Sequence, residues 1–383
     1  MPQIALYYPW MHFQNDHWLK LALLTWDGIV RVRPPGAPDR DQDLVRQLRR
    51  ESDFIVETTP GPRVLDTVAT SFEQVIDTDP DRILNGYRLG YDGAWRGYEP
   101  PPSQRAPEPE PGDSELVWVF AEAPGAKMAS RLAAMLVRAG LARRSAGPWL
   151  GLRPPLGSVY LAVLTDAMAR HERLRPATDD PRMHTAVGAL DRLSELLTGD
   201  PAPRSTLDSA ESAYLHVALR SVLVPDDLDR VPTRKLIRFR ERHRAELAAF
   251  HDHVASLGPQ LADIAEVESL PVASAHLKAL YERETGPRLD ELRRALRGFG
   301  IESSAGALAQ KIDLGAAGGT VLGGLAAAGG QLAVAGAAVA VSVVPYLAGR
   351  VRSRRATIRD SPVSYLLAVG RELSASTLLG KLR

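Results

Sequence analysis

Apolar and polar positions at the start of the chain repeat with two different periods. Residues 3–8 (QIALYY) form a short apolar run, and residues 29–32 (IVRV) alternate with the period that is typical of a strand. Between them, residues 18–27 (WLKLALLTWD) place apolar side chains three and four positions apart, which predicts a helix after a turn at Asn15 and Asp16. We therefore expect a strand, a helix and a second strand, the start of an α/β arrangement.

The same alternation continues up to a proline-rich stretch. The pattern predicts a helix over residues 43–51, a strand over residues 54–57 and a helix after Pro62. Residues 99–114 (EPPPSQRAPEPEPGDS) contain six prolines in sixteen residues, a composition that excludes a helix interior and a central strand. This stretch is predicted to be a linker or an exposed loop.

Beyond that stretch the pattern changes from mixed to helical. Residues 115–123 favour a buried strand, residues 126–142 a helix and residues 149–152 another strand. From residue 156 onward almost every segment has helical spacing, and the predicted helices span residues 156–174, 183–198, 207–223, 233–257, 274–299 and the tail from 361. The fold class that we predict is α+β, with a small N-terminal α/β portion followed by a mainly α-helical C-terminal portion.

One segment of the C-terminal portion differs from the others because it has no charged residue. Residues 314–349 are 36 residues without Asp, Glu, Lys or Arg, and Gly329 and Gly330 divide them into halves of about 17 to 19 residues. Each half is roughly 26 to 28 Å long as a helix, close to the hydrocarbon thickness of a bilayer. The pattern predicts an apolar Gly/Ala-rich helical hairpin, whose row of small residues comprises Gly315, Gly319, Gly323 and Ala327.

The predicted hairpin is too rich in glycine to be a stable helix in water. Each glycine costs roughly 1 kcal/mol relative to alanine in an exposed helix, so lipid, the protein's own helices or a second copy must surround it. A basic flank follows directly, as it does on the cytoplasmic side of a membrane segment, and comprises Arg350, Arg352, Arg354 and Arg355. We predict that the hairpin mediates self-association, contact with another protein or conditional membrane contact.

These patterns divide the chain into five predicted parts. They are an N-terminal α/β portion (1–98), a proline-rich loop or linker (99–114), a mixed and then helical portion (115–310), the hairpin with its basic flank (311–360) and a C-terminal helix (361–383). No repeat of fixed period is present, so a solenoid is not expected.

Composition narrows the classes of function. The net charge is +1, with 45% apolar and 24% charged residues, so the chain as a whole is neither disordered nor a basic nucleic-acid coat. The absence of cysteine excludes a disulfide framework, a thiolate metal site and a cysteine nucleophile. No apolar run of signal-peptide length opens the chain, which favours a cytoplasmic location, with membrane association through the hairpin as an alternative.

The sequence contains few motifs that are known to bind ligands or to take part in catalysis. The sequence has no HExxH, GxxxxGK[ST], GxSxG or strand-linked GxGxxG motif, and we predict no metal and no cofactor. An enzyme is an alternative, with a pocket at the carboxyl ends of the N-terminal strands, where α/β sheets commonly bind ligands. The residues expected near its mouth are Tyr7, Tyr8, His12 and Asp16.

A basic cluster provides a further alternative, which is nucleic-acid binding. In the predicted helix over residues 233–257, positive side chains gather in the N-terminal half opposite an apolar stripe. The residues that would contact a phosphate backbone are Arg234, Lys235, Arg238 and Arg242. Glutamates lie close by in the same segment, so a solvated, salt-bridged face is the stronger interpretation.

Five stretches of the sequence are distinctive: ALYYPW, WLKLALLTWD, KMASRLAAMLVRAGLA, YLAVLTDAMARHERLRPATDD and SPVSYLLAV. Together they resemble a family of uncharacterised bacterial proteins known chiefly from high-GC Gram-positive species, and the likeness extends over most of the chain. Arg outnumbers Lys 41 to 6, which also fits a high-GC genome. The resemblance implies no activity and no catalytic residue. The function that we predict is a non-enzymatic interaction protein, and its most specific form is a switched effector of bacterial stress or conflict.

Overall fold

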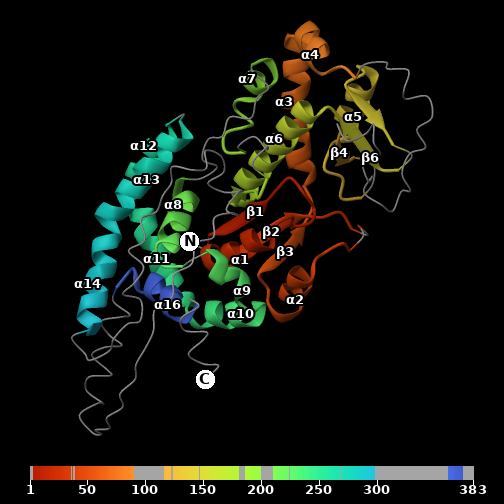
Figure 1. The fold of residues 1–383 in the computed structure, drawn as a ribbon. Helices are drawn as coiled ribbons and strands as arrows, with labels where there is room; N and C mark the ends of the chain where they lie inside the picture. The colour runs from red at the N-terminus through yellow and green to blue at the C-terminus, as the bar shows by residue number, and fades with distance from the viewer. Residues whose placement is uncertain are drawn as a thin grey trace. The chain divides into compact units, whose positions relative to one another are not determined.

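The computed structural model consists of two compact units, Met1–Ser209 and Ala210–Arg383, which we name unit 1 and unit 2 (Figure 1). The structure describes residues 3–35, 37, 39–89, 116–121, 124–145, 147–180, 186–199, 210–223, 225–267, 269–297 and 361–373. Within these residues, unit 1 contains two sheets with helices and unit 2 is helical. The predicted α+β class is therefore confirmed.

The parallel sheet of unit 1 has four strands in the order β3-β2-β1-β7. These strands are β1 (Ile4–Tyr7), β2 (Gly28–Val32), β3 (Ile55–Thr58) and β7 (Arg175–Ala177). On one side of β1 lies β2, the next strand in the chain, and on the other side lies β7, which follows much later. The winding of the sheet therefore reverses beside β1, and the carboxyl ends of all four strands meet at one edge.

Two helices connect the first three strands and confirm the predicted start of the chain. Helix α1 (Asp16–Thr25) follows β1, and α2 (Asp43–Glu51) joins β2 to β3. The side chain of Asn15 accepts a hydrogen bond from the backbone nitrogen of Trp18 at 3.0 Å. Asn15 therefore caps the first turn of α1 and determines where the loop after β1 ends.

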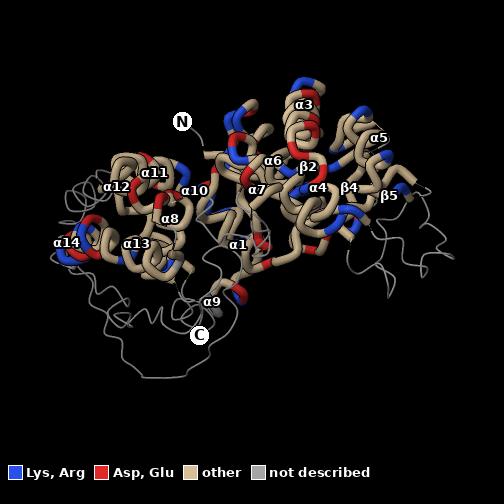
Figure 2. The backbone as a smooth tube through the Cα atoms, turned by 90° about the horizontal axis from the view of Figure 1, so that it is seen from above, with Lys and Arg blue, Asp and Glu red and all other residues tan. Residues whose placement is uncertain are grey.

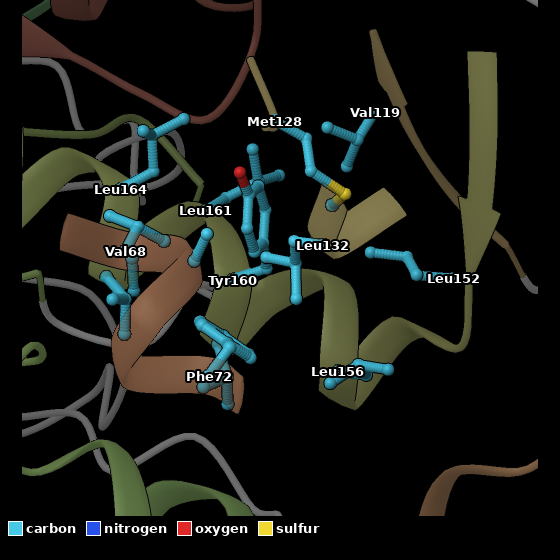
Figure 3. Packing of buried hydrophobic residues seen from close by; sticks show 14 of the residues in the cluster. Val68, Phe72, Val119, Met128, Leu132, Leu152, Leu156, Tyr160, Leu161 and Leu164 are labelled. Carbon is cyan, nitrogen blue, oxygen red and sulfur yellow. The ribbon is translucent and has the colours of Figure 1, made fainter. Parts of the chain in front are cut away.

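The core of unit 1 is built around one helix that is buried on all sides. The remaining helices of this unit are α3 (Pro62–Thr78), α4 (Pro80–Tyr87), α5 (Ser130–Arg138), α6 (Pro154–Glu172) and α7 (Leu193–Thr198). Every residue of α6 from Leu156 to Ala169 is buried, and α6 packs along α3 (Figure 1). Figure 3 shows Phe72 of α3 near Tyr160 of α6, with 5.4 Å between the ring centroids. A helix that is buried all round must pack against other elements on every side. For α6 these elements are α3, α7 and both sheets.

A second sheet, which is antiparallel, packs against α6 in the strand order β4-β6-β5. Its strands are β4 (Val117–Phe120), β5 (Ala142–Arg144) and β6 (Trp149–Leu152). A Cβ atom on Gly157 of α6 would lie 2.5 Å from the Cβ atom of Val117. Glycine is therefore required for the observed approach of the helix to the strand.

Unit 2 is a set of packed helices. They are α8 (Ala210–Arg220), α9 (Pro225–Arg230), α10 (Thr233–Arg242), α11 (Arg244–Ser256), α12 (Gly258–Ala265), α13 (Leu270–Glu284), α14 (Gly286–Arg297) and α16 (Ser364–Glu372). Helix α8 packs against α11, α12, α13 and α16, and α14 packs against both α13 and α16. The ring of Tyr365 in α16 lies 5.9 Å from that of Phe239 in α10 and 6.3 Å from that of Phe250 in α11, measured between centroids. Aromatic contacts thus hold α16 in the core of unit 2.

Three predicted helices differ from the helices in the structure. The predicted helix over residues 233–257 breaks at His243, where φ is −106° and ψ is 24°, so α10 and α11 are separate. The predicted helix over residues 274–299 breaks before α14, where Pro287 has no amide hydrogen to continue the helical hydrogen bonds. Within the predicted helix over residues 183–198, only α7 is helical in the described part.

Two short strands, β5 and β7, have no counterpart among the predicted elements. Each has three residues, which is too few to show an alternating pattern. Strand β7 also contains Pro176, which lies in register with Leu6 of β1. Proline has no amide hydrogen, and it is tolerated here because β7 is an edge strand.

Two predicted parts, the proline-rich stretch 99–114 and the hairpin 311–360, lie outside the described residues. The predicted C-terminal helix over residues 361–383 is represented by α16. Among the helices that the structure describes, none is long and apolar enough to span a membrane.

Candidate functional site

The loops that follow the parallel strands bring polar side chains to the carboxyl edge of the sheet. The loop after β1 spans residues 8–15, and its first residue extends the ladder, since the backbone nitrogen of Tyr8 donates to the carbonyl oxygen of Ala177 at 3.1 Å. Ala177 is the last residue of β7. The two strands that flank the reversal of winding are therefore joined at the place where open α/β sheets bind ligands.

The loop between β4 and α5 crosses the same edge of the sheet. Gly125 of this loop has a φ of +80°, and a Cβ atom there would lie 2.5 Å from Cδ of Pro35 and 2.9 Å from Cγ2 of Thr59. Pro35 follows β2 and Thr59 follows β3. A glycine is thus needed for both the backbone conformation and the close contact, which places this loop over the ends of two strands.

His12, in the loop after β1, forms a pair with Asp41, in the segment before α2. Nδ1 of His12 lies 3.1 Å from Oδ1 of Asp41, whose side chain is fully buried, whereas the His12 side chain is 17% exposed. An ionised carboxylate only accepts hydrogen bonds, so Nδ1 carries a proton, and in the neutral form of the ring Nε2 then has the lone pair. Within the described part of the chain, Nε2 has no hydrogen-bond partner. Its lone pair is therefore available to a molecule at the edge.

Arg31 holds the Asp41 carboxylate in place. Its Nη1 and Nη2 atoms donate to Oδ1 and Oδ2 of Asp41, each at 2.6 Å, and Nη2 also donates to Oε1 of Glu57 at 2.5 Å. Burial by itself would raise the pKa of Asp41, but the hydrogen bonds from Arg31 and His12 outweigh burial and hold this pKa well below its usual range. Asp41 therefore stays ionised, and the two-pronged contact with Arg31 fixes the orientation of the His12 ring.

A second buried pair ties the loop after β1 to the end of β7. The hydroxyl of Tyr7 donates to Oδ1 of Asp179 at 2.8 Å, and the backbone nitrogen of Gln14 donates to Oδ2 at 3.1 Å. Burial raises the pKa of Asp179, and burial together with the nearby Asp179 raises the pKa of Tyr7. Asp179 thus receives one bond from each end of the loop that carries His12.

Of the four residues predicted to lie near a pocket mouth, the structure brings Tyr7 and His12 together. The Tyr7 hydroxyl lies 3.2 Å from the backbone oxygen of His12. Tyr8 is buried directly after β1, and Asp16 is the first residue of α1. All four are on the segment that follows β1, and their role in ligand binding stays a prediction.

The sequence pattern did not identify the residues that hold His12. Asp41 lies in the segment before α2, and Asp179 follows β7, a strand without a sequence signal. Arg31 fits the polar position of an alternating strand, yet it is fully buried. The charge of Arg31 was itself an available signal. The central strands of parallel sheets are mostly apolar, so a charged residue within one indicates an internal ion pair.

The basic residues predicted to contact nucleic acid are partly engaged within unit 2. Nζ of Lys235 donates to the backbone oxygen of Glu372 at 2.5 Å, and Nη1 of Arg242 donates to the Glu372 carboxylate at 2.7 Å. Arg234 and Arg238 are exposed. Figure 2 shows basic and acidic positions mixed along α14 in the same unit. Because Glu372 belongs to α16, part of the cluster anchors this helix, and nucleic-acid binding stays a prediction.

The residues predicted to mediate assembly or membrane contact lie outside the described residues. They are Gly315, Gly319, Gly323, Ala327, Arg350, Arg352, Arg354 and Arg355. Their roles stay predictions. In the part of the chain that the structure describes, no three His, Cys, Asp or Glu side chains gather in an arrangement suited to a metal ion.

Comparisons with known proteins place the chain in a family. A family model matches residues 99–374, which is most of the chain. The matched range includes Asp179 and the loop between β4 and α5, whereas His12, Arg31 and Asp41 precede it. No curated protein matches the chain, and no solved structure matches it.

Proposed function

The chain belongs to DUF6236, a family of unknown function, and we propose that unit 1 catalyses proton transfer on a small polar molecule at the carboxyl edge of its parallel sheet. The observation that carries this proposal is the pair of His12 and Asp41, in which Nδ1 is held by the carboxylate and Nε2 has no partner among the residues that the structure describes. The sequence predicts the same place for an enzyme pocket without assigning a catalytic residue, and our proposal adds His12 as the general acid–base residue.

The surroundings of His12 support this role because they fix the ring before any ligand binds. A histidine whose Nδ1–H is held by a carboxylate presents Nε2 in one orientation, ready to accept a proton and to return it. Arg31 donates to both oxygens of that carboxylate, including the Oδ1 atom that His12 contacts, and its Cζ atom lies 5.6 Å from the centroid of the Phe13 ring. Preorganisation of this kind is what catalytic histidines require.

The protonation pattern of His12 is the direct physical test of the proposal. In protein labelled with ¹⁵N-histidine, long-range ¹H–¹⁵N correlations at mildly alkaline pH are expected to show a proton on Nδ1 and none on Nε2. The variant Asp41→Asn is expected to lose this preference, because a neutral amide also offers donors to the ring. A proton on Nε2 in the native protein would contradict the proposal.

The chemical test is a search for conversion of small molecules. The full-length protein is incubated with a bacterial metabolite extract, and consumed compounds are identified by mass spectrometry. His12→Gln is expected to slow the conversion by about 100-fold or more, which is the usual contribution of a general acid–base residue. The control is His276→Gln, which changes an exposed histidine of α13 in unit 2. Equal rates for His12→Gln and the control would count against His12.

One observation in unit 2 favours a second function, the interaction role predicted for the hairpin. Helix α14 ends at Arg297, α16 begins at Ser364, and these two helices pack against each other. A segment that leaves and re-enters a unit at neighbouring helices has the connectivity that a hairpin requires. We propose that residues 314–349 mediate self-association, contact with another protein or conditional membrane contact, as in an effector of bacterial stress or conflict.

Deletion of residues 314–349 tests the interaction role. The full-length chain is expected to sediment with membranes or to elute as an oligomer, and the deleted chain is expected to do neither. Deletion of residues 99–114 is the matched control, because it removes a second segment from the chain. Identical behaviour of the full-length chain and the chain without residues 314–349 would contradict this role.

For localisation we propose the cytoplasm of a bacterium, with membrane association through the hairpin. The ratio of Arg to Lys, 41 to 6, supports a high-GC genome, and we propose a high-GC Gram-positive species as the source. Fractionation of such cells into soluble and membrane pools tests the proposed location.

A further inference from the structure

Lys127 lies in the loop between β4 and α5, and its backbone is fixed to the core of unit 1. Its nitrogen donates to the carbonyl oxygen of Phe120 at 2.6 Å. Its carbonyl oxygen accepts a hydrogen bond from the hydroxyl of Tyr160, a buried residue of α6, at 2.6 Å. The position of Lys127 is therefore set by the core.

The Lys127 side chain is buried, and no carboxylate of the described chain neutralises it. The residue is 6% exposed, and Nζ donates a hydrogen bond of 3.2 Å to the backbone oxygen of Pro9. Pro9 belongs to the loop after β1, the same loop that carries His12. Within the described residues, this carbonyl oxygen is the partner of the ammonium group.

Three carboxylates at this edge of the sheet are engaged with other groups. Asp41 and Glu57 both accept hydrogen bonds from Arg31. Asp179 accepts from the Tyr7 hydroxyl and from a backbone nitrogen. None of these three carboxylates provides the counter-charge for Lys127.

A buried ammonium group without a counter-charge is unfavourable for the folded protein. Ammonium has three N–H donors, and within the described part of the chain the Pro9 carbonyl oxygen accepts from one of them and the other two have no acceptor. Burial lowers the pKa of Lys127 to about 8, so the group is still mostly protonated at neutral pH. Perturbed groups of this kind cluster at functional sites.

The residue type adds a second argument. Lysine accounts for only 6 of the 47 basic residues in the chain. A lysine at a buried position is therefore an exception to the arginine preference of this sequence. The ammonium group is a compact point charge, which suits a single oxyanion better than the planar guanidinium fork does in a confined space.

We propose that the Lys127 ammonium binds an oxyanion of the substrate, which is a phosphate or a carboxylate group of a small molecule. The anion supplies the missing counter-charge and accepts the two remaining N–H donors. This inference rests on the proposed function, because it names the substrate class of the same site. Since Pro9 and His12 share one loop, the molecule held by Lys127 is the one that exchanges a proton with His12.

Anion titration of matched variants of the full-length chain tests this inference. Inorganic phosphate and succinate are titrated separately by calorimetry at constant ionic strength and neutral pH, so that the two sources of oxyanion are distinguished. Lys127→Met keeps the length of the side chain and removes its charge. The control is Lys278→Met, on α13 of unit 2. The native chain and the control are expected to bind at least one of the two anions, and Lys127→Met is expected to bind it about tenfold or more weakly.

Two results overturn the inference. One is equal affinity of the native chain and Lys127→Met for the anion, and the other is no binding of either anion to the native chain at millimolar concentration. Neither result depends on which nitrogen of His12 carries the proton. The proposed function is therefore judged separately, by the ¹H–¹⁵N correlations of His12. Conversely, loss of the His12 signature with retained, Lys127-dependent phosphate binding would remove the proton-transfer proposal and keep the anion site.

Discussion

His12 in unit 1 and His253 in unit 2 both belong to polar clusters, but they differ in how many ring nitrogens the protein uses. His12 binds Asp41 through Nδ1, and Nε2 has no partner in the described chain. In α11, Nε2 of His253 lies 2.9 Å from Oγ1 of Thr285, and Nδ1 accepts a hydrogen bond of 3.1 Å from Arg288. A histidine satisfied at both nitrogens supports packing, whereas one with an open nitrogen is available for chemistry.

The groups around the two histidines reinforce this difference. Thr285 is fully buried, and its hydroxyl lies 2.6 Å from that of Tyr214, so the hydrogen bonds of His253 continue into the core of unit 2. Burial, and then the positive charge of Arg288, lower the pKa of His253, which keeps the ring neutral. The groups that hold His12 are the ionised Asp41 and Arg31 instead, and their order depends on charge pairing.

The largest difference in stability between the two clusters is expected when the arginine of each cluster is removed. Arg31→Met leaves the fully buried Asp41 carboxylate without its buried cation, which should lower the free energy of unfolding by about 3–5 kcal/mol. Arg288→Met removes an exposed side chain and should cost less than about 1 kcal/mol. Urea unfolding of both variants measures the difference, and equal losses would refute the distinction between the clusters.

Removing the histidines should have the opposite result, with the larger loss of stability in unit 2. His253→Ala leaves the buried hydroxyl of Thr285 with one partner fewer and opens a cavity, at an expected cost of about 2–3 kcal/mol. His12→Ala leaves the pair of Arg31 and Asp41 intact and should cost less than about 1 kcal/mol. The same unfolding assay applies. A larger loss for His12→Ala would mean that His12 is mainly structural.

Lys127→Met is expected to stabilise the ligand-free protein. A pKa lowered from 10.5 to about 8 corresponds to roughly 3 kcal/mol against the charged form, and the lost bond to Pro9 offsets about 1 kcal/mol, which leaves a gain on the order of 2 kcal/mol. The folded pKa lies below the unfolded one, so the native chain becomes more stable as the pH rises from 8 towards 10.5, and the advantage of the variant fades. Unfolding free energies across this range measure the gain, and a destabilised variant would contradict it.

The pH response of His253 is the smallest expected effect. Its pKa is lower in the folded protein than the ordinary 6.5, so the unfolded chain binds more protons below neutral pH. Stability therefore falls as the pH falls through 6.5, and His253→Gln should show a shallower decline between about pH 7 and pH 5. Thermal unfolding of the two chains in parallel measures this difference, and identical slopes would exclude His253 as its origin.

The local parts of the fold could be predicted from the sequence because their signals lie within single segments. The apolar spacing of residues 18–27 and the cap at Asn15 were sufficient for the first strand, helix and strand. Strand β7 could not be predicted, since three residues around Pro176 carry no pattern. His12 could be named from its place after the first strand.

The partners in the candidate site could not be predicted in the same way. Asp41 is 29 positions from His12, and Asp179 is 172 positions from Tyr7. Their contacts depend on the order of the strands in the sheet, which spacing along the chain does not contain. The burial of Lys127 likewise depends on how one loop crosses the ends of strands from another part of the sequence.

The late arrival of β7 has a consequence for biosynthesis. During translation β1, β2 and β3 leave the ribosome long before β7, so one side of β1 has no neighbour in the sheet until Ala177 has emerged. Asp179 follows two residues later, and the loop with His12 gains its anchor at the same moment. A nascent chain, or a fragment that stops before Arg175, therefore exposes an unpaired strand edge. Such an edge is prone to aggregation and is a target for chaperones.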